Sequence, residues 1–215
     1  MRIERIRVAR VPLVLISPLR TSDGAHQSRS AVLVEITDSD GFVGWGENVA
    51  TSGVAYVGES AEASYAAMTQ LLIPELVQHD VAVADLFADG WWGIAGQHFA
   101  KHSLESALWD VHARRQGKSL AEVLGADETE IEVGVVVGMH DSIDDVVAEV
   151  MMRVEQGYAR VKVKIAPGHD VEVLAAVRDA VGVEYALQAD ANGAYGADDI
   201  DLLRSLDKFA LQFIE

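Results

Sequence analysis

The chain has 215 residues, half of them hydrophobic, and it contains no cysteine. This composition predicts a folded globular protein with one large core or two smaller ones, and it excludes disulfides and a thiolate nucleophile. The formal net charge of −17 argues against binding to nucleic acid or to an anionic membrane surface, because both require a basic face.

The first ten residues, MRIERIRVAR, alternate charged and apolar side chains and lack the apolar stretch of a signal peptide. No later segment approaches the roughly 20 apolar residues that a membrane-spanning helix needs. We therefore expect a cytoplasmic protein.

Residues 1–125 have the pattern of an α+β domain. Three segments alternate like β-strands: 2–13, 31–38 and 41–47. Two segments have apolar residues at helical spacing: 59–76 and 99–116. The sequence DSDG predicts a hairpin turn between the second and third strands. We attribute Gly41, Gly44 and Gly46 to the geometry of this hairpin.

Residues 126–215 show a regular alternation of strands and helices. The predicted strands are 132–139, 159–165, 183–190 and 209–215, and the predicted helices are 142–157, 170–182 and 197–206. This alternation predicts parallel pairing, in either an open doubly wound sheet or a barrel. Chemically active residues follow three neighbouring strands, which favours a (β/α) TIM-like barrel, since the active site of a barrel lies at these strand ends.

Four strands are about half of an eight-stranded barrel, which needs roughly 250 residues. We therefore expect a capping domain followed by the first half of a barrel, truncated after the fourth strand. The last strand would have an unpaired edge, leaving Phe209, Leu211 and Phe213 exposed. We expect residues 1–215 alone to self-associate and to be inactive.

Lys162 and Lys164 are two positions apart in a predicted strand, so they point to the same side, whereas Val161, Val163 and Ile165 point to the helices. Desolvation and mutual repulsion of two interior ammonium groups favour the neutral amine. A neutral amine can take a proton from carbon.

Asp190 and Glu215 end the third and fourth strands and are 25 positions apart, which is about one strand-helix-strand repeat. They should therefore be neighbours at the rim of the barrel. Carboxylates are preferred ligands of hard divalent cations such as Mg²⁺, so the sequence predicts a metal site with an amine base.

The segments KVKIAPGHD, DANGAY and the final FIE resemble the enolase superfamily, and specifically its muconate-lactonizing-like branch. The phrases GWGE, VGM followed by DSI, and KIAPGHD resemble the o-succinylbenzoate synthase/N-acylamino acid racemase family. Residues 18–24 and 44–50 resemble the two capping-domain loops that close over the substrate in this superfamily.

The resemblance implies that Lys164 is the acid/base catalyst and Lys162 its electrostatic helper. Asp190 and Glu215 become ligands of Mg²⁺ or Mn²⁺, and Asn192 lies near the substrate carboxylate. Two further residues are candidates for substrate binding: Arg20, in the first capping loop, and Val136, in the first barrel strand. Val136 stands where a small hydroxyl residue is expected, and His169 follows PG where an aromatic or another residue is often found. The third acidic ligand and a lysine on the opposite face are expected from later strands.

The implied function is metal-dependent abstraction of a proton next to a carboxylate, with stabilisation of the resulting enediolate. The first choice is a lyase, o-succinylbenzoate synthase, which performs a dehydration on the way to menaquinone. The alternative is an N-acylamino acid racemase or a related epimerase. An alternative of another class is an inactive fragment or a non-catalytic half that needs the rest of the barrel. The expected partner is a small carboxylate substrate, and a homo-oligomer is expected at full length.

Overall fold

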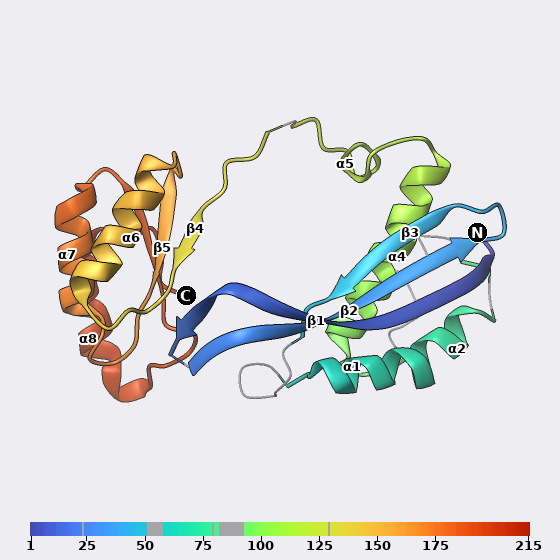
Figure 1. The fold of residues 1–215 in the computed structure, drawn as a ribbon, viewed down its shortest axis with the longest axis horizontal. Coiled ribbons are helices and arrows are strands. Elements are labelled where there is room, and N and C mark those ends of the chain that lie inside the picture. Colours follow the sequence, from blue (N-terminus) through green and yellow to red (C-terminus); the bar gives the residue numbers. More distant parts are fainter. Residues whose placement is uncertain (23, 51–57, 79, 82–92, 129) are drawn as a thin grey trace. The chain divides into compact units, whose positions relative to one another are not determined.

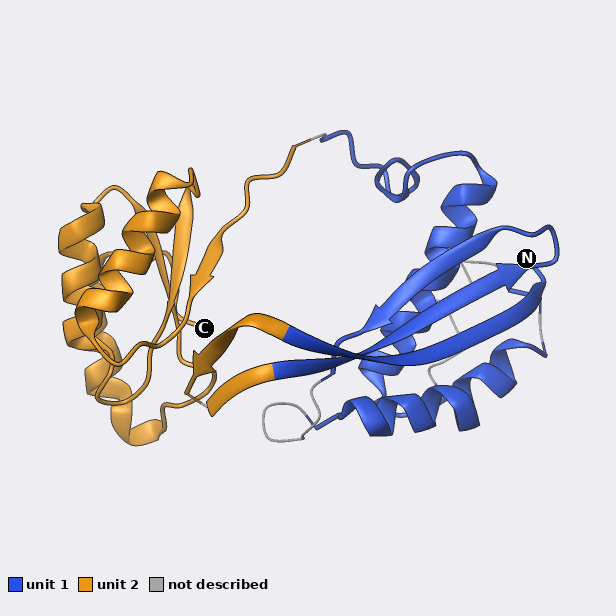
Figure 2. Ribbon diagram, viewed as in Figure 1, with its two compact units in different colours: residues 1–14, 28–128 blue, residues 15–27, 129–215 orange. Residues whose placement is uncertain are grey.

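A computed structural model describes residues 1–22, 24–50, 58–78, 80–81, 93–128 and 130–215 (Figure 1). These residues form two compact units, each with its own hydrophobic core. Residues 1–14 and 28–128 make the first unit, and residues 15–27 and 129–215 make the second (Figure 2). None of the described helices combines the length and the hydropathy needed to cross a membrane.

The first unit contains a three-stranded sheet and several helices, as the sequence predicts. Its strands pair in the order β1 (Ile3–Thr21), β2 (Gly24–Asp38) and β3 (Val43–Asn48), and β2 and β3 are antiparallel. Its helical segments are α1 (Ala61–Ala67), the π-helical turn Met68–Leu72, α2 (Ile73–Leu76), α4 (His98–Arg115) and α5 (Leu120–Val123). Alternate residues of β2, such as Val34 and Ile36, are fully buried in one core with Leu104 and Leu108 of α4. This pattern is the one expected for a sheet that packs one face on helices.

Gly44 and Gly46 let the backbone of β3 approach the backbone of α4. A Cβ atom at Gly46 would lie 1.9 Å from the carbonyl oxygen of Ser103, and one at Gly44 would lie 2.3 Å from that of Ala107. Both separations are far shorter than van der Waals contact, so only glycine fits at either position. The attribution of these two glycines to turn geometry is therefore wrong. It holds for Gly41, whose φ is +85°.

Asp38, the last residue of β2, connects the hairpin turn to the end of α4. Its Oδ1 atom accepts hydrogen bonds from the amides of Asp40 and Phe42, at 3.0 and 2.9 Å, and its Oδ2 atom accepts one from Arg115. Burial raises the pKa of Asp38, but the hydrogen bonds and the charge of Arg115 outweigh burial. The pKa of Asp38 therefore lies below its usual value.

Asp38→Asn is expected to lower the Tm of the first unit at pH 7. A carboxylate with a depressed pKa stabilises the folded state above its unfolded pKa of about 3.9, and this contribution is lost as the pH falls through the folded pKa. The Tm difference between wild type and variant should therefore be full at neutral pH and shrink below about pH 4. Calorimetry from pH 7 to pH 3 measures it, and a constant difference over that range would contradict the assignment.

Asp40→Asn is the matched control. Asp40 pairs with the same arginine, but its side chain is 57% exposed whereas that of Asp38 is 0% exposed. An exposed ion pair contributes little, so the Tm of this variant should stay close to that of wild type.

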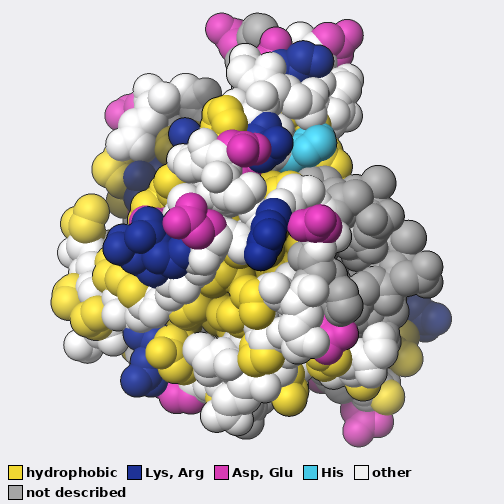
Figure 3. All heavy atoms as spheres, turned by 90° about the vertical axis from the view of Figure 1, so that its right-hand side faces the viewer, with side chains coloured by type: hydrophobic (Ala, Val, Ile, Leu, Met, Phe, Trp, Pro, Cys, Tyr) yellow, Lys and Arg dark blue, Asp and Glu magenta, His cyan; other side chains and the backbone are white. Residues whose placement is uncertain are grey.

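The surface drawn in Figure 3 has basic and acidic side chains interspersed, with hydrophobic side chains between them. Trp45 of β3 is one exposed hydrophobic residue of the first unit, and Leu71 is another. Mixed charge with scattered apolar side chains is ordinary for a globular protein.

The second unit is a parallel sheet with helices, which confirms the predicted alternation. Strands β4 (Val135–Val137), β5 (Arg160–Lys164) and β6 (Ala186–Asp190) pair in that order. The helices are α6 (Ile143–Glu155), α7 (Val171–Val181) and α8 (Ile200–Ser205), with 3₁₀ turns at Ala197–Asp199 and Leu206–Phe209. Gly157 and Gly182 follow α6 and α7 with positive φ, as expected for residues that end helices.

The two faces of the parallel sheet differ in polarity. Val161, Val163 and Leu187 are fully buried in the core that also contains residues of α6 and α7. The alternate positions of β5 and β6 carry polar side chains: Lys162, Lys164, Gln188 and Asp190. The helices lie on one side of the sheet (Figure 1), and cover on one side only is consistent with part of a barrel.

The last predicted strand, 209–215, pairs with β6 only near its end. Ile214 forms a parallel bridge with Ala189, and the amide of Glu215 donates to the carbonyl of Ala189 at 3.0 Å. Phe209 instead ends a 3₁₀ turn and is only 6% exposed, and Leu211 packs against the second core, so their predicted exposure is wrong. Phe213 is 47% exposed, as predicted.

The 3₁₀ turn is held on the core by Arg178 of α7. The Nε atom of Arg178 donates to the carbonyl of Phe209 at 2.8 Å, and its Nη2 atom donates to that of Ala210 at 3.0 Å. Ala210 has a φ of 49° and separates the turn from the extended residues that follow. This reversal is the physical reason why Phe209 turns inward.

Candidate active site

Lys162 and Lys164 of β5 face the same side, and the hydrophobic residues between them face the core, as predicted. Strand register places Lys162 opposite Gln188 and Lys164 opposite Asp190. Because parallel strands have their carboxyl ends at one edge, Lys164 and Asp190 meet at the ends of β5 and β6. Glu215 joins them through the bridge between Ile214 and Ala189.

Lys164 is held by two oxygen atoms from the neighbouring strand end. Its Nζ atom donates to Oδ2 of Asp190 at 2.6 Å and to Oδ1 of Asn192 at 2.7 Å. Lys164 is 7% exposed and Asp190 is 2% exposed, so the pair is almost completely removed from water. A buried ion pair is tolerated when further hydrogen bonds satisfy its atoms, which Asn192 does here.

Lys162 lies between two carboxylates. Its Nζ atom is 2.6 Å from Oε2 of Glu215 and 3.5 Å from Oδ2 of Asp190. Asp190 and Glu215 therefore lie close enough to contact the same cation, as the strand spacing predicts.

The protonation of this cluster differs in part from the prediction. The hydrogen bond to Glu215 raises the pKa of Lys162, and burial, which would lower it, is the weaker effect. Burial raises the pKa of Asp190, but the hydrogen bonds from Lys164 and from the amide of Asn192 outweigh it, so that pKa lies below its usual value. The prediction that repulsion neutralises both amines is wrong for Lys162, because the carboxylate of Glu215 accompanies its ammonium group.

Asn192 belongs to the tight turn that follows β6. Its φ is 50°, in the left-handed region, and its amide donates to Oδ1 of Asp190 at 2.8 Å. Asparagine tolerates this conformation better than most residues do. The turn therefore aims the Asn192 side chain at Lys164 while its backbone holds Asp190.

The other two predicted substrate-binding residues are Val136 and Arg20. Val136 is opposite Lys162 in the sheet register and is 40% exposed. Arg20 lies near the tip of the ribbon formed by β1 and β2, where its guanidinium pairs with Asp141 at 2.6 Å. Its carbonyl accepts a hydrogen bond from the amide of Met139 at 3.0 Å, just after β4.

Ser22, in the same predicted capping loop, is also attached to a strand end. Its hydroxyl donates to the carbonyl of Ala191, directly after Asp190, at 2.7 Å. Asp23, in this loop, lies outside the described residues. The tip of the ribbon therefore contacts the residues that directly follow two strands, β4 and β6.

Sequence reasoning missed the pair formed by Tyr195 and Asp170. Tyr195 donates from its hydroxyl to Oδ2 of Asp170 at 2.9 Å, and Oδ1 of Asp170 caps α7 by accepting from the amide of Val171. Burial, with the hydrogen bond to Asp170, raises the pKa of Tyr195 well above its usual range, so the phenol stays neutral. The preference of aspartate for helix N-caps could have identified Asp170, but nothing in the sequence pairs it with Tyr195.

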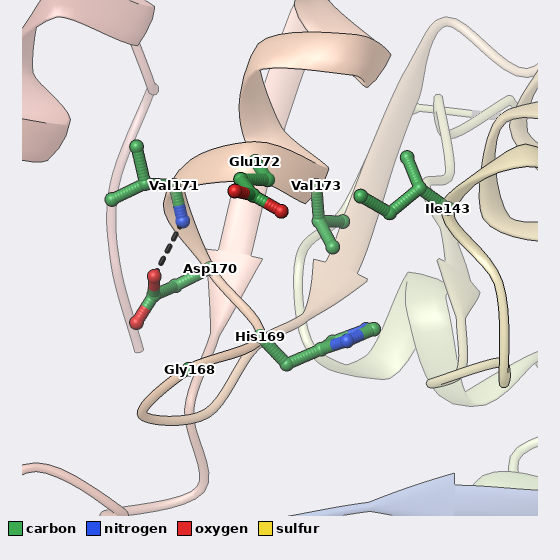
Figure 4. Close-up of a pocket in the computed structure, with 7 residues that line it drawn as sticks. All are labelled: Ile143, Gly168, His169, Asp170, Val171, Glu172 and Val173. Atoms are coloured by element: carbon green, nitrogen blue, oxygen red, sulfur yellow. Dashed lines mark hydrogen bonds between the residues drawn. The ribbon is translucent and has the colours of Figure 1, made fainter.

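A pocket of about 300 Å³ opens beside this pair (Figure 4). It is lined by Ile143 and residues 168–173. The His169 ring points toward Ile143 and away from Asp170, and its buried Nε2 atom has no hydrogen-bond partner among the described residues. None of the predicted catalytic or metal-binding residues lines this pocket.

The predicted metal ligands fit part of a site for a hard cation. Asp190 and Glu215 supply carboxylate oxygens, and the ammonium group of Lys162 already contacts both, in the way a bound cation would. Among the described residues, no group of three or more His, Asp or Glu side chains has a geometry that could hold a metal ion. Asp190 and Glu215 are therefore the two predicted ligands that the described residues offer.

Comparison with known proteins identifies the family. Residues 3–125 match the model of the mandelate racemase/muconate lactonizing enzyme N-terminal domain, and residues 145–215 match the enolase C-terminal domain-like model. The chain belongs to the mandelate racemase/muconate lactonizing enzyme family of the enolase superfamily, which confirms the resemblance stated from the motifs.

Individual relatives narrow the similarity further. An o-succinylbenzoate synthase from Geobacillus kaustophilus is 39% identical over 99% of this chain and 56% of the relative. An N-succinylamino acid racemase from Amycolatopsis sp. is 34% identical over 100% of this chain and 58% of the relative. The crystal structure of an enolase superfamily member from Listeria innocua matches with a TM-score of 0.93 and 33% identity, covering 100% of this chain and 57% of that one. The chain thus spans little more than half the length of these proteins.

Proposed function

We propose that this chain supplies the base and part of the metal site of an enzyme that removes a proton next to a carboxylate, with dehydration to o-succinylbenzoate as the reaction. The cluster of Lys162, Lys164, Asp190 and Glu215 at adjacent strand ends carries the proposal. The relative named o-succinylbenzoate synthase, at 39% identity, supports the choice of reaction. The parallel sheet would be part of a (β/α) barrel, whose active site lies at this edge.

Lys164 is the proposed acid/base catalyst. The neutral amine accepts the substrate proton at Nζ, and the contacts with Asp190 and Asn192 fix the direction of that atom. In the dehydration, Nζ takes the α-proton, the bond to the β-hydroxyl breaks, and the ammonium group returns a proton to the leaving oxygen as water. Lys162 contributes a nearby positive charge.

Asp190 and Glu215 would hold Mg²⁺ or Mn²⁺. The ion would supply positive charge that stabilises the charge developing on the substrate carboxylate. Because Mg²⁺ takes about six oxygen ligands, two carboxylates need completion by further groups. We therefore propose that residues 1–215 alone bind the ion weakly and have no turnover.

Asp190→Asn is expected to abolish Mg²⁺-dependent turnover of the whole protein without unfolding it, because the amide keeps the shape of the side chain but lacks the charge. Steady-state rates in Mg²⁺ and in EDTA, together with a melting curve, test this. Asp201→Asn removes a carboxylate that is 96% exposed and should leave the rate unchanged. Full activity of Asp190→Asn, or of wild type in EDTA, would exclude the metal role.

Racemisation of N-acylamino acids, or a related epimerisation, is the second candidate, supported by the relative named N-succinylamino acid racemase at 34% identity. The two reactions share the base and the metal and differ in the product. Incubation of the whole protein with the hydrated precursor of o-succinylbenzoate should produce aromatic absorbance. Incubation with a single enantiomer of an N-succinylamino acid in D₂O should exchange the α-proton if racemisation is the activity.

We further propose that the partner is a small carboxylate substrate rather than nucleic acid or a membrane, and that the whole protein is a homo-oligomer. The alternative, a non-catalytic protein, predicts that neither substrate reacts with the whole protein in saturating Mg²⁺.

A further inference from the structure

Asn192, which contacts Lys164, belongs to one of two neighbouring loops that are joined at both ends. Residues 165–170 follow β5, and residues 191–196 follow β6. At the strand ends, the amide of Ile165 donates to the carbonyl of Asp190 at 2.9 Å. At the far ends, the hydroxyl of Tyr195 donates to Oδ2 of Asp170 at 2.9 Å.

The two residues that join the far ends of the loops, Asp170 and Tyr195, are each fixed by other interactions. Asp170 is 6% exposed and caps α7 through its other oxygen. Tyr195 packs its side chain against the second core. Between Asp190 and Tyr195, the turn is closed by the amide of Ala194, which donates to the carbonyl of Ala191 at 3.1 Å. Asn192 lies inside this short turn, so its orientation depends on where Tyr195 is anchored.

We propose that the hydrogen bond between Tyr195 and Asp170 is a positioning device that holds the Asn192 carboxamide against Lys164 and so fixes the direction of Lys164 Nζ. The inference rests on the proposed function, in which Lys164 is the base. Tyr195 and Asp170 act through Asn192 and are positioning residues, not catalytic ones.

Tyr195→Phe tests the device, because it removes only the hydroxyl. NMR spectra of ¹⁵N-labelled protein report the ammonium signal of Lys164 and the carboxamide signal of Asn192. Both signals are expected to shift and broaden. Tyr185→Phe is the matched control, since Tyr185 is another partly buried tyrosine. It directly precedes β6, at the end of that strand away from Asp190, and its hydroxyl donates to the carbonyl of Tyr158. It should leave both signals unchanged.

Asp170→Asn provides a second variant if Tyr195→Phe does not fold, because asparagine caps helices about as well as aspartate does. It weakens the acceptor for Tyr195 and should perturb the same two signals. Signals identical to those of Tyr185→Phe in the folded variants would overturn the proposal.

Steady-state kinetics distinguish a failure of the positioning role from a failure of the proposed function. In the whole protein, Tyr195→Phe should lower kcat by about 10-fold with KM unchanged, as expected when a catalytic group is displaced slightly. An unchanged kcat would overturn the positioning role. Perturbed signals in a protein whose wild type has no turnover would support the device and contradict the proposed function.

Discussion

Lys164→Ala is expected to lower the kcat of the whole protein by about 1000-fold, within the range that general acid-base catalysis contributes. The variant lacks the only amine that contacts both Asp190 and Asn192 in the described part of the chain. Lys162→Ala should lower kcat less, because Lys162 supplies charge and does not transfer the proton. Steady-state kinetics of both variants measure the difference.

Lys164→Arg is the informative control for this prediction. Arginine can keep the ion pair with buried Asp190, but with a pKa above roughly 12 it does not release its proton. The variant should therefore fold and remain inactive, whereas Lys164→Ala also loses stability because Asp190 loses its nearest cation. Wild-type turnover in either variant would rule out Lys164 as the base.

Gly46→Ala is expected to destabilise the first unit by about 3 kcal/mol, which corresponds to a fall in Tm of roughly 10 °C. The added methyl would lie 1.9 Å from a backbone oxygen of α4, so the helix has to move away from β3. Thermal melting followed by circular dichroism measures the loss.

Gly58→Ala is the matched control, since a Cβ atom at Gly58 meets no atom of the described residues within 4 Å. Its Tm should equal that of the wild type. If the Tm of Gly46→Ala also equalled that of the wild type, the close packing of β3 on α4 would be contradicted.

The alternation of strands and helices after residue 130 was predictable because side-chain periodicity follows directly from backbone geometry. The same rule placed Lys162 and Lys164 on one face and their valine neighbours in the core. The chain spacing of Asp190 and Glu215 predicted that they lie together, because each strand-helix repeat returns the chain to the same edge of the sheet.

The contacts that the sequence did not reveal depend on distances between segments far apart in the chain. Gly44 and Gly46 follow a hairpin, so a turn explained them locally. The helix backbone that excludes a side chain at these positions lies about 60 residues further along the chain. The alternating pattern around Phe209 predicted a strand, but Arg178 of an earlier helix holds that segment in a turn. The prediction for Lys162 failed because it weighed the repulsion between two lysines without the carboxylate beside each.

The contacts of the ribbon tip have a consequence for dividing the protein experimentally. Residues 15–27 belong to the second unit, and within them Arg20 bonds to Met139 and Ser22 to Ala191. A fragment beginning at residue 129 would lack a segment encoded more than 100 positions earlier, so no single cut releases the second unit whole. Domain swaps that preserve it must carry both pieces of sequence, and two separately expressed halves would have to exchange this ribbon to restore it.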